Sequence, residues 1–310
     1  MASRVIHGIH PPPSHEQPWP SFKLPFTDLA AGSLAGAAQV IVGHPLDTVK
    51  VRAQISPKGM FKSPSDIILK TIRKEGLFAL YKGMASPLLG IAAQNSLLFT
   101  AFSFSKRLVS DTPDLSVGQT AAAGALAGAA NSVLASPVEL FKIRMQAQYG
   151  GTSDRKLSQV ARDVWNESGF RNGVMRGFWI TVLREIPAYA GFYSAFEASK
   201  RGFRSKLYPE LGPEESLPVW CLMLSGSTGG IANWLACYPL DVVKSKVQLS
   251  NKPLSDKGIG YIAEEFRTIA REQGHQAFFR GLSPTLLRAI PAAAATFTTF
   301  ELSKNVLEGL

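Results

Sequence analysis

The chain has 310 residues, of which 45% are hydrophobic and 18% are charged, and its formal net charge is +10. This composition is too apolar for a disordered protein. The positive charge is compatible with acidic substrates, anionic lipid or nucleic acid, so composition alone selects no function. The two cysteines, Cys221 and Cys237, lie in one apolar run and predict neither a disulfide framework nor a metal site.

In chain order, residues 1–24 come first, and we expect a short disordered lead because they contain no apolar core of a secretory signal. Four runs without Asp, Glu, Lys or Arg follow, at residues 29–46, 84–105, 115–138 and 217–240. Each can cross about 30 Å of hydrocarbon as a helix. Two more apolar stretches, 178–193 and 282–300, are interrupted only by Arg184, Glu185 and Arg288. The pattern predicts six transmembrane helices, with buried helices of a soluble protein as the weaker alternative.

A unit of roughly one hundred residues occurs three times. Each copy has a proline, an acid two positions later and a lysine five positions later, and the prolines are 92 and 102 residues apart. A glycine lies nine residues before each proline, and a glutamine lies nine residues after it. We therefore predict repeats over residues 25–112, 113–212 and 213–310, each formed by a helix, a basic polar segment and a second helix.

Lysine and arginine are concentrated inside these units. The segments 50–82, 142–176 and 244–280 hold 22 of the 33 basic residues. By the positive-inside rule, the three segments share one side of a membrane and both termini lie on the other side.

The repeated pattern Pro-x-[Asp/Glu]-x-x-[Lys/Arg]-x-[Lys/Arg], followed by an aromatic-basic-glycine step, resembles the mitochondrial carrier family over residues 25–306. The resemblance implies an all-α membrane protein with six transmembrane helices, a matrix helix in each repeat and threefold pseudosymmetry. It also implies the mitochondrial inner membrane, with both termini on the intermembrane-space side. The second unit departs from the pattern, with Met175 in place of the aromatic residue and one extra residue after Gly169.

A proline kinks a membrane helix, and charges just beyond it are costly there unless they are paired. The resemblance implies three ion pairs that close the matrix side, and three glutamines that brace them by hydrogen bonds below. Separate pairs within each helix are the alternative. The implied pairs are Asp47–Lys142, Glu139–Lys244 and Asp241–Lys50, and the implied braces are Gln54, Gln146 and Gln248.

On the even-numbered spans the family closes the opposite mouth with an aromatic-acid-x-x-base motif. Two copies fit this motif, whereas Ser103 stands where the first copy should have an acid, so we expect the weaker gate on the cytoplasmic side. The implied gate residues are Lys106, Glu197, Lys200, Glu301 and Lys304. The aromatic-basic-glycine steps imply cardiolipin binding at helix starts by Lys82, Gly83, Arg176, Gly177, Arg280 and Gly281.

An ionisable residue inside a membrane span is a candidate functional residue. Arg184 and Arg288 lie seven residues after the glycines that open their spans, where the resemblance places substrate contacts, and Gly90 is their counterpart in the first repeat. Two arginines can bind a carboxylate, and Glu185 can attract an ammonium group, so the site suits a zwitterion. The local sequence is most similar to ornithine-type and carnitine-type carriers.

Ornithine-type carriers have Glu-Asn-Ser where this chain has Gln94, Asn95 and Ser96. Without that glutamate a dibasic substrate loses a charged partner, and Gly90 leaves room, so we expect a neutral amino acid or an acylcarnitine. The alternatives are an uncoupling-type proton or anion carrier, a carrier of nucleotides or other organic acids, and a non-transporting scaffold. No nucleophile–base pair, metal cluster or phosphate loop indicates an enzyme. We expect no cofactor, no nucleic acid partner, and a monomer that exchanges its substrates.

Overall fold

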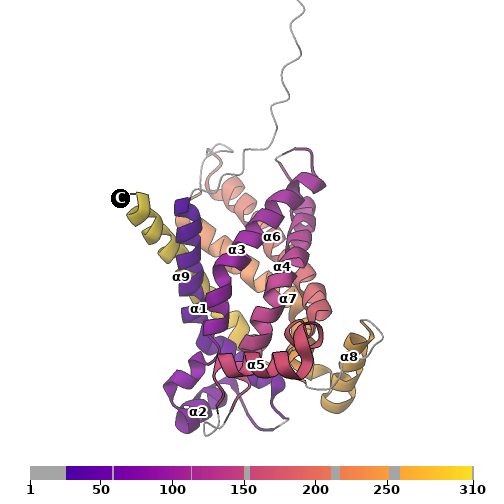
Figure 1. The fold of residues 1–310 in the computed structure, drawn as a ribbon. Helices are drawn as coiled ribbons and strands as arrows, with labels where there is room; N and C mark the ends of the chain where they lie inside the picture. Colours follow the sequence, from indigo (N-terminus) through magenta and orange to yellow (C-terminus); the bar gives the residue numbers. More distant parts are fainter. Residues whose placement is uncertain are drawn as a thin grey trace, which may run out of the picture.

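The computed structural model describes residues 26–57, 59–112, 114–149, 154–210, 217–250 and 259–308, so the predicted lead over residues 1–24 lies outside the described part. Within these ranges the chain is helical, as expected (Figure 1). The six long helices are α1 (Phe26–Ile55), α3 (Ala85–Val109), α4 (Val117–Gln146), α6 (Phe178–Leu207), α7 (Val219–Leu249) and α9 (Leu282–Glu308).

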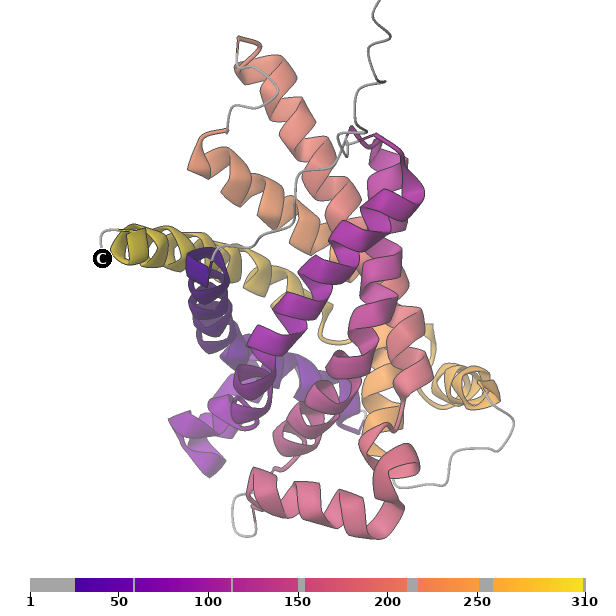
Figure 2. The same ribbon diagram turned by 45° about the horizontal axis from the view of Figure 1, so that its top comes forward.

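The long helices form a ring in which each packs against the next along the chain, and α9 returns to pack against α1. Figure 2 shows this bundle with its top turned forward. With 25 to 31 residues each, these helices match the thickness of a bilayer. By length and apolar composition alone, two segments of the described residues qualify as membrane-crossing helices, Leu77–Val109 and Val117–Gln146.

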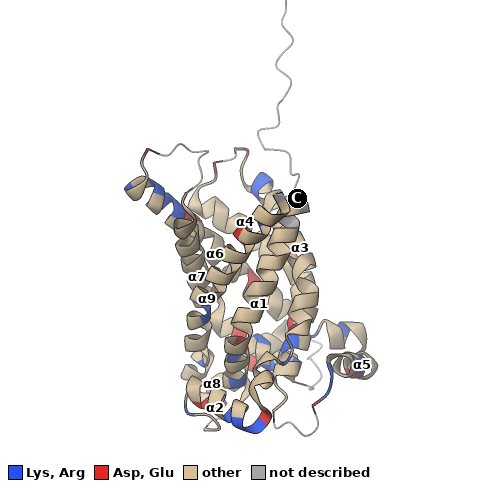
Figure 3. Ribbon diagram, turned by 90° about the vertical axis from the view of Figure 1, so that its left-hand side faces the viewer, with Lys and Arg blue, Asp and Glu red and all other residues tan. Residues whose placement is uncertain are grey.

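Three short amphipathic helices lie at one end of the bundle (Figure 1). Their apolar residues pack against the ends of α1, α4 and α7. For the first of them, Ser63 accepts a hydrogen bond of 3.1 Å from the N–H of Asp66, which caps the start, and Gly76 ends the helix with a φ of 84°. Many of the lysine and arginine positions along the ribbon lie at this end (Figure 3). The helices are α2 (Pro64–Glu75), α5 (Leu157–Ser168) and α8 (Gly260–Gln273).

A short turn of helix joins each amphipathic helix to the next long helix. In the first and third repeats it is a 3₁₀ helix, η1 (Leu77–Tyr81) and η3 (His275–Phe279). In the second repeat it is a π-helix, η2 (Gly169–Val174), in which the N–H of Met175 donates to the carbonyl oxygen of Phe170 at 2.9 Å. The wider π turn thus accommodates the extra residue of the second repeat. The helix that follows, α6, can therefore start at the position that corresponds to α3 and α9 in the other repeats.

The glycine at the end of each turn fixes how neighbouring repeats meet. Gly83 has a φ of 84°, and a Cβ there would lie 2.9 Å from the carbonyl oxygen of Lys142 in the next repeat. Gly281 has a φ of 82°, and a Cβ there would lie 3.0 Å from the carbonyl oxygen of Lys50. Both the positive φ and the close approach exclude a side chain. The second and sixth membrane spans, α3 and α9, therefore start in contact with the ends of α4 and α1.

Candidate functional site

Three ion pairs connect α1, α4 and α7 near the end that carries the amphipathic helices. Lys142 Nζ lies 2.5 Å from Asp47, and Lys50 Nζ lies 2.7 Å from Asp241. Lys244 pairs with Glu139 in the same way. The structure thus brings together the acid and the lysine of each pair that the resemblance implied. Because every pair joins two different repeats, the three pairs hold three proline-containing helices together.

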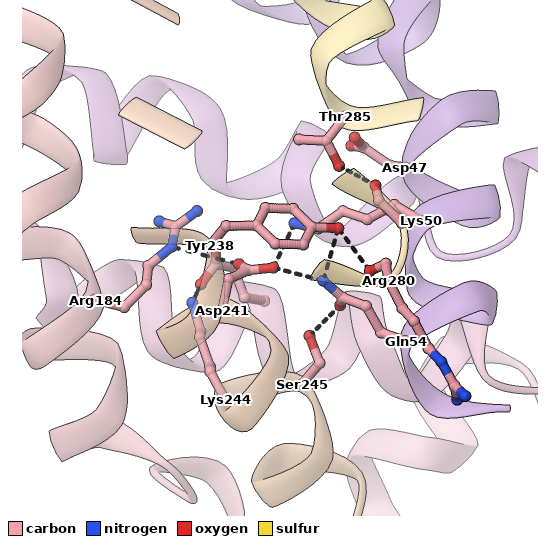
Figure 4. A network of polar contacts seen from close by, with 12 residues as sticks. Asp47, Lys50, Gln54, Arg184, Tyr238, Asp241, Lys244, Ser245, Arg280 and Thr285 are labelled. Atoms are coloured by element: carbon pink, nitrogen blue, oxygen red, sulfur yellow. Dashed lines mark hydrogen bonds and ion pairs between the residues drawn. The ribbon is translucent and has the colours of Figure 1, made fainter. Parts of the chain in front are cut away.

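The three glutamines lie beside these pairs, but within the described part of the chain only Gln54 contacts an acid of the ring. Gln54 donates to Asp241 at 3.0 Å and accepts a hydrogen bond of 2.8 Å from Ser245 (Figure 4). Gln146 instead donates to Thr48 at 3.1 Å, and Gln248 donates to the carbonyl oxygen of Ser136 at 3.3 Å. All four bonds cross between repeats, so the glutamines join helices even where they do not touch the acids.

Both intramembrane arginines contact acids of the ion-pair ring. Arg288 Nε lies 2.9 Å from Asp47, and Arg184 Nε lies 3.4 Å from Asp241 (Figure 4). Arg184 also pairs with its neighbour Glu185, and both side chains are buried. Among the described residues, Glu139 pairs with Lys244 and with no arginine. Two corners of the ring are therefore connected to the candidate substrate residues, whereas the third corner is not.

The first repeat has no arginine at this level. A Cβ at Gly90 would lie 2.7 Å from Val138 of α4, so α4 fills the space that we expected Gly90 to leave open. Asn95 lies against α1, since its amide nitrogen would be 3.2 Å from a Cβ at Gly36. Gln94 turns back along its own helix, with its amide nitrogen 2.8 Å from the same Cβ position at Gly90. Contacts of these three residues with substrate remain predictions.

Two residues at the site were not found from the sequence. The centre of the Trp234 ring lies 3.9 Å from Lys50 Nζ and 5.0 Å from the guanidinium carbon of Arg184. Trp234 therefore contacts both a lysine of the ion-pair ring and an arginine of the candidate substrate site. Gly43 allows Arg288 to lie against α1, because a Cβ there would be 2.4 Å from Arg288 Nε. The sequence offers two signals for these residues. Trp234 lies five residues before Pro239, and Gly43 lies two residues before Pro45.

A second polar cluster lies below the ring and joins the first repeat to the second. Arg52 donates to Glu75 through two nitrogens, at 2.8 and 3.0 Å, and to the carbonyl oxygen of Gln148 at 3.0 Å. Lys82 pairs with Glu75 and with Asp154 of the second repeat. Burial by itself would raise the pKa of Glu75, but the hydrogen bonds from Arg52 and Lys82 outweigh it and lower that pKa below its ordinary value.

The basic residues of the aromatic-basic-glycine steps contact protein groups. Lys82 forms the two ion pairs just described, and Arg176 donates to the carbonyl oxygen of Val247 at 2.8 Å. Arg280 lies 3.4 Å from the side-chain oxygen of Gln273. Cardiolipin binding at these steps therefore stays a prediction, for which the backbone N–H groups at the helix starts are the available donors.

The opposite end of the bundle has contacts of another kind. Glu197 pairs with Lys200 at 3.3 Å and with Arg201 at 2.9 Å, both on its own helix. Lys106 Nζ lies 5.4 Å from the centre of the Phe102 ring. Glu301 is exposed, and it lies near the end of α9 with Lys304. The two ion pairs of Glu197 thus lie along its own helix, whereas Asp47, Glu139 and Asp241 pair with lysines of other helices.

Six long helices around a ring of inter-repeat ion pairs, with the buried Arg184 and the partly buried Arg288 among them, define a membrane transport protein built from tandem repeats. The sequence model described as "Mitochondrial carrier protein" matches residues 23–112, 113–207 and 215–309, and the chain belongs to this family.

Similar proteins span nearly the whole chain. The chain is 40% identical to "Mitochondrial substrate carrier family protein S" of Dictyostelium discoideum, over 90% of this chain and 97% of that protein. It is 36% identical to "Mitochondrial ornithine transporter 1" of Mus musculus, over 90% and 94% of the two chains. It is 34% identical to "Mitochondrial carnitine/acylcarnitine carrier-like protein" of Arabidopsis thaliana, over 90% and 98%.

Proposed function

We propose that this mitochondrial solute transporter moves a small zwitterion, an amino acid or a carnitine ester, across the inner membrane. The observation that carries the proposal is the set of Arg184 and Glu185, which are buried, and Arg288, which is partly buried, on two helices of the bundle. The guanidinium groups present paired donors to a carboxylate, and Glu185 presents a carboxylate to an ammonium group. The names of the ornithine and carnitine relatives support the same class of substrate.

The contacts of the two arginines support transport by exchange. Because Arg288 and Arg184 already bind Asp47 and Asp241, a substrate carboxylate competes with two acids of the matrix ring for the same donors. Substrate binding thereby weakens the contacts of Asp47 and Asp241, two of the three acids of the ion-pair ring. This favours opening to the matrix only when the site is occupied. The arrangement described here is then the state closed to the matrix, with both termini on the intermembrane-space side and the carrier acting as a monomer.

The test is exchange in proteoliposomes by Arg288→Ala, Arg288→Lys and the unchanged protein. We expect Arg288→Ala to lose at least 100-fold in rate, about 3 kcal/mol, because one forked carboxylate contact disappears. Arg288→Lys should recover only part of it, since lysine lacks the fork. The control is Arg155→Ala, whose side chain is 64% exposed and pairs only with Asp163 among the described residues. Exchange by Arg288→Ala within twofold of the unchanged protein would contradict the site assignment.

A further inference from the structure

A column of aromatic rings extends from the candidate substrate residues along α6. Tyr189 and Tyr193 follow Glu185 by one and two helical turns, so the three side chains lie along one side of the helix. The rings of Tyr189 and Tyr193 stack with their centroids 6.1 Å apart. Tyr193 in turn stacks flat against Phe102 of α3, with centroids 3.8 Å apart and an interplanar angle of 8°.

The column faces the interior of the bundle. A Cβ at Gly128 would lie 2.7 Å from Tyr189, and a Cβ at Gly124 would lie 2.7 Å from Tyr193, so both rings lie over the small residues of α4. Gly128 precedes Glu139 by eleven residues, which is three helical turns, and it therefore shares the face that pairs with Lys244 of α7.

The contact between α3 and α6 crosses the same face. The ring of helices places α4 between α3 and α6, so a stack of Phe102 on Tyr193 must pass over one side of α4. The outward side of α4 is exposed, with Leu126 at 48% and Val133 at 49% of their full accessibility. The stacked rings therefore cover the inward side.

No charged residue interrupts this path. On α6 there is none between Glu185 and Glu197, and on α3 there is none between Lys82 and Lys106. A cationic side chain of a substrate whose ammonium group binds Glu185 would meet aromatic rings and no second carboxylate along this column. An apolar chain would lose water-exposed surface against the same rings, which is favourable.

We propose that Tyr189, Tyr193 and Phe102 form the subsite for the side group of the substrate, and that this group is apolar. The inference rests on the proposed function, because it takes the carboxylate and the ammonium group of the substrate to lie at Arg184, Arg288 and Glu185. Either a long aliphatic or aromatic amino-acid side chain or the acyl chain of a carnitine ester has this chemistry.

The experiment measures exchange rates in proteoliposomes for two series of increasing chain length. One series is alanine, norvaline, norleucine and phenylalanine, and the other is carnitine, butyrylcarnitine and octanoylcarnitine. We expect one series to rise by about tenfold or more from its shortest to its longest member, since each buried methylene contributes about fourfold. The series that rises identifies the source of the apolar group. Rates that are flat or that fall with length in both series would overturn the proposal.

Variants test whether the rings cause the preference. Tyr193→Ala and Phe102→Ala should reduce the ratio of longest to shortest substrate at least fivefold while exchange of the shortest substrate persists, and Tyr193→Phe should keep the ratio because it retains the ring. The control is Phe104→Ala, which removes a ring that is 62% exposed on the same helix as Phe102. An unchanged ratio in both alanine variants overturns the subsite. If neither series exchanges at all, the proposed function itself fails, whereas exchange of only the shortest members refutes the subsite alone.

Discussion

At the scale of single residues, the position of Arg288 depends on the absence of a side chain on the facing helix. Arg288 Nε reaches Asp47 at 2.9 Å because α1 carries glycine at position 43. An alanine Cβ there would lie 2.4 Å from Arg288 Nε and 3.2 Å from its guanidinium carbon. The arginine would have to move away from Asp47 and from the position that we propose for substrate binding.

We therefore expect Gly43→Ala to lower exchange about tenfold or more while the protein still folds, because alanine favours a helix by about 1 kcal/mol over glycine. The matched control is Gly32→Ala on the same helix, where a Cβ would meet nothing within 4 Å. Exchange rates and melting temperatures of the two variants check this. Equal rates for Gly43→Ala and Gly32→Ala would show that the contact between Arg288 and α1 is unimportant.

Individual residues also show which parts of the candidate site could be predicted from the sequence. The acids and lysines of the ion-pair ring were predictable, because their spacing around each proline repeats three times. The contacts of Arg184 and Arg288 with Asp241 and Asp47 were not, since they depend on how closely helices of different repeats approach. The expectation that Gly90 leaves open space failed for the same reason, because Val138 belongs to the neighbouring helix.

At the scale of elements, the end of α2 joins the first two repeats through Glu75. Its side chain is only 1% exposed, and both Arg52 and Lys82 donate to it. The aromatic ring of Tyr149 lies 4.9 Å from the guanidinium carbon of Arg52, which adds a second contact from the segment after α4. This cluster stabilises the arrangement in which the C-terminal ends of α1 and α4 are together. The repeated motifs predicted three equivalent repeats, but they could not predict this cluster, because Gln148, Tyr149 and Asp154 lie outside the repeated motifs.

We expect Glu75→Gln to lower the melting temperature at pH 7 by roughly 5 °C or more, because removing one partner of a buried ion pair costs about 3 kcal/mol. The fold lowers the pKa of Glu75, so the stabilisation is complete above the ordinary value of 4.5 and is lost as the pH falls below it. The difference in melting temperature between Glu75→Gln and the unchanged protein should therefore become smaller as the pH falls below about 4.5.

Melting curves of detergent-purified protein between pH 7 and pH 4 measure both effects. Glu264→Gln, at an exposed position on α8, is the control and should change little at either pH. A constant difference across the pH range would mean that the ionised form of Glu75 does not stabilise the cluster.

At the scale of the whole molecule, the two ends of the bundle differ. At the end that carries the amphipathic helices, three ion pairs and three glutamines join different repeats, and the Arg52 cluster adds to them. At the other end, Glu197 pairs along its own helix, and Ser103 occupies the place of one gate acid. We therefore expect the end that carries the amphipathic helices to be the closed end when no substrate is bound, because the unloaded equilibrium follows the free-energy difference between the two states.

The most direct test of the zwitterion site is a thermal-shift screen of the unchanged, purified protein. A ligand that binds the folded carrier raises its apparent stability by about 2.7 kcal/mol at 100 times its dissociation constant. Neutral amino acids, carnitine and its esters, dibasic amino acids, dicarboxylates and nucleotides would be compared at equal concentration. The account predicts the largest rise in melting temperature with a neutral amino acid or a carnitine ester. Stabilisation by a nucleotide or a dicarboxylate, with no shift from any zwitterion, would contradict it.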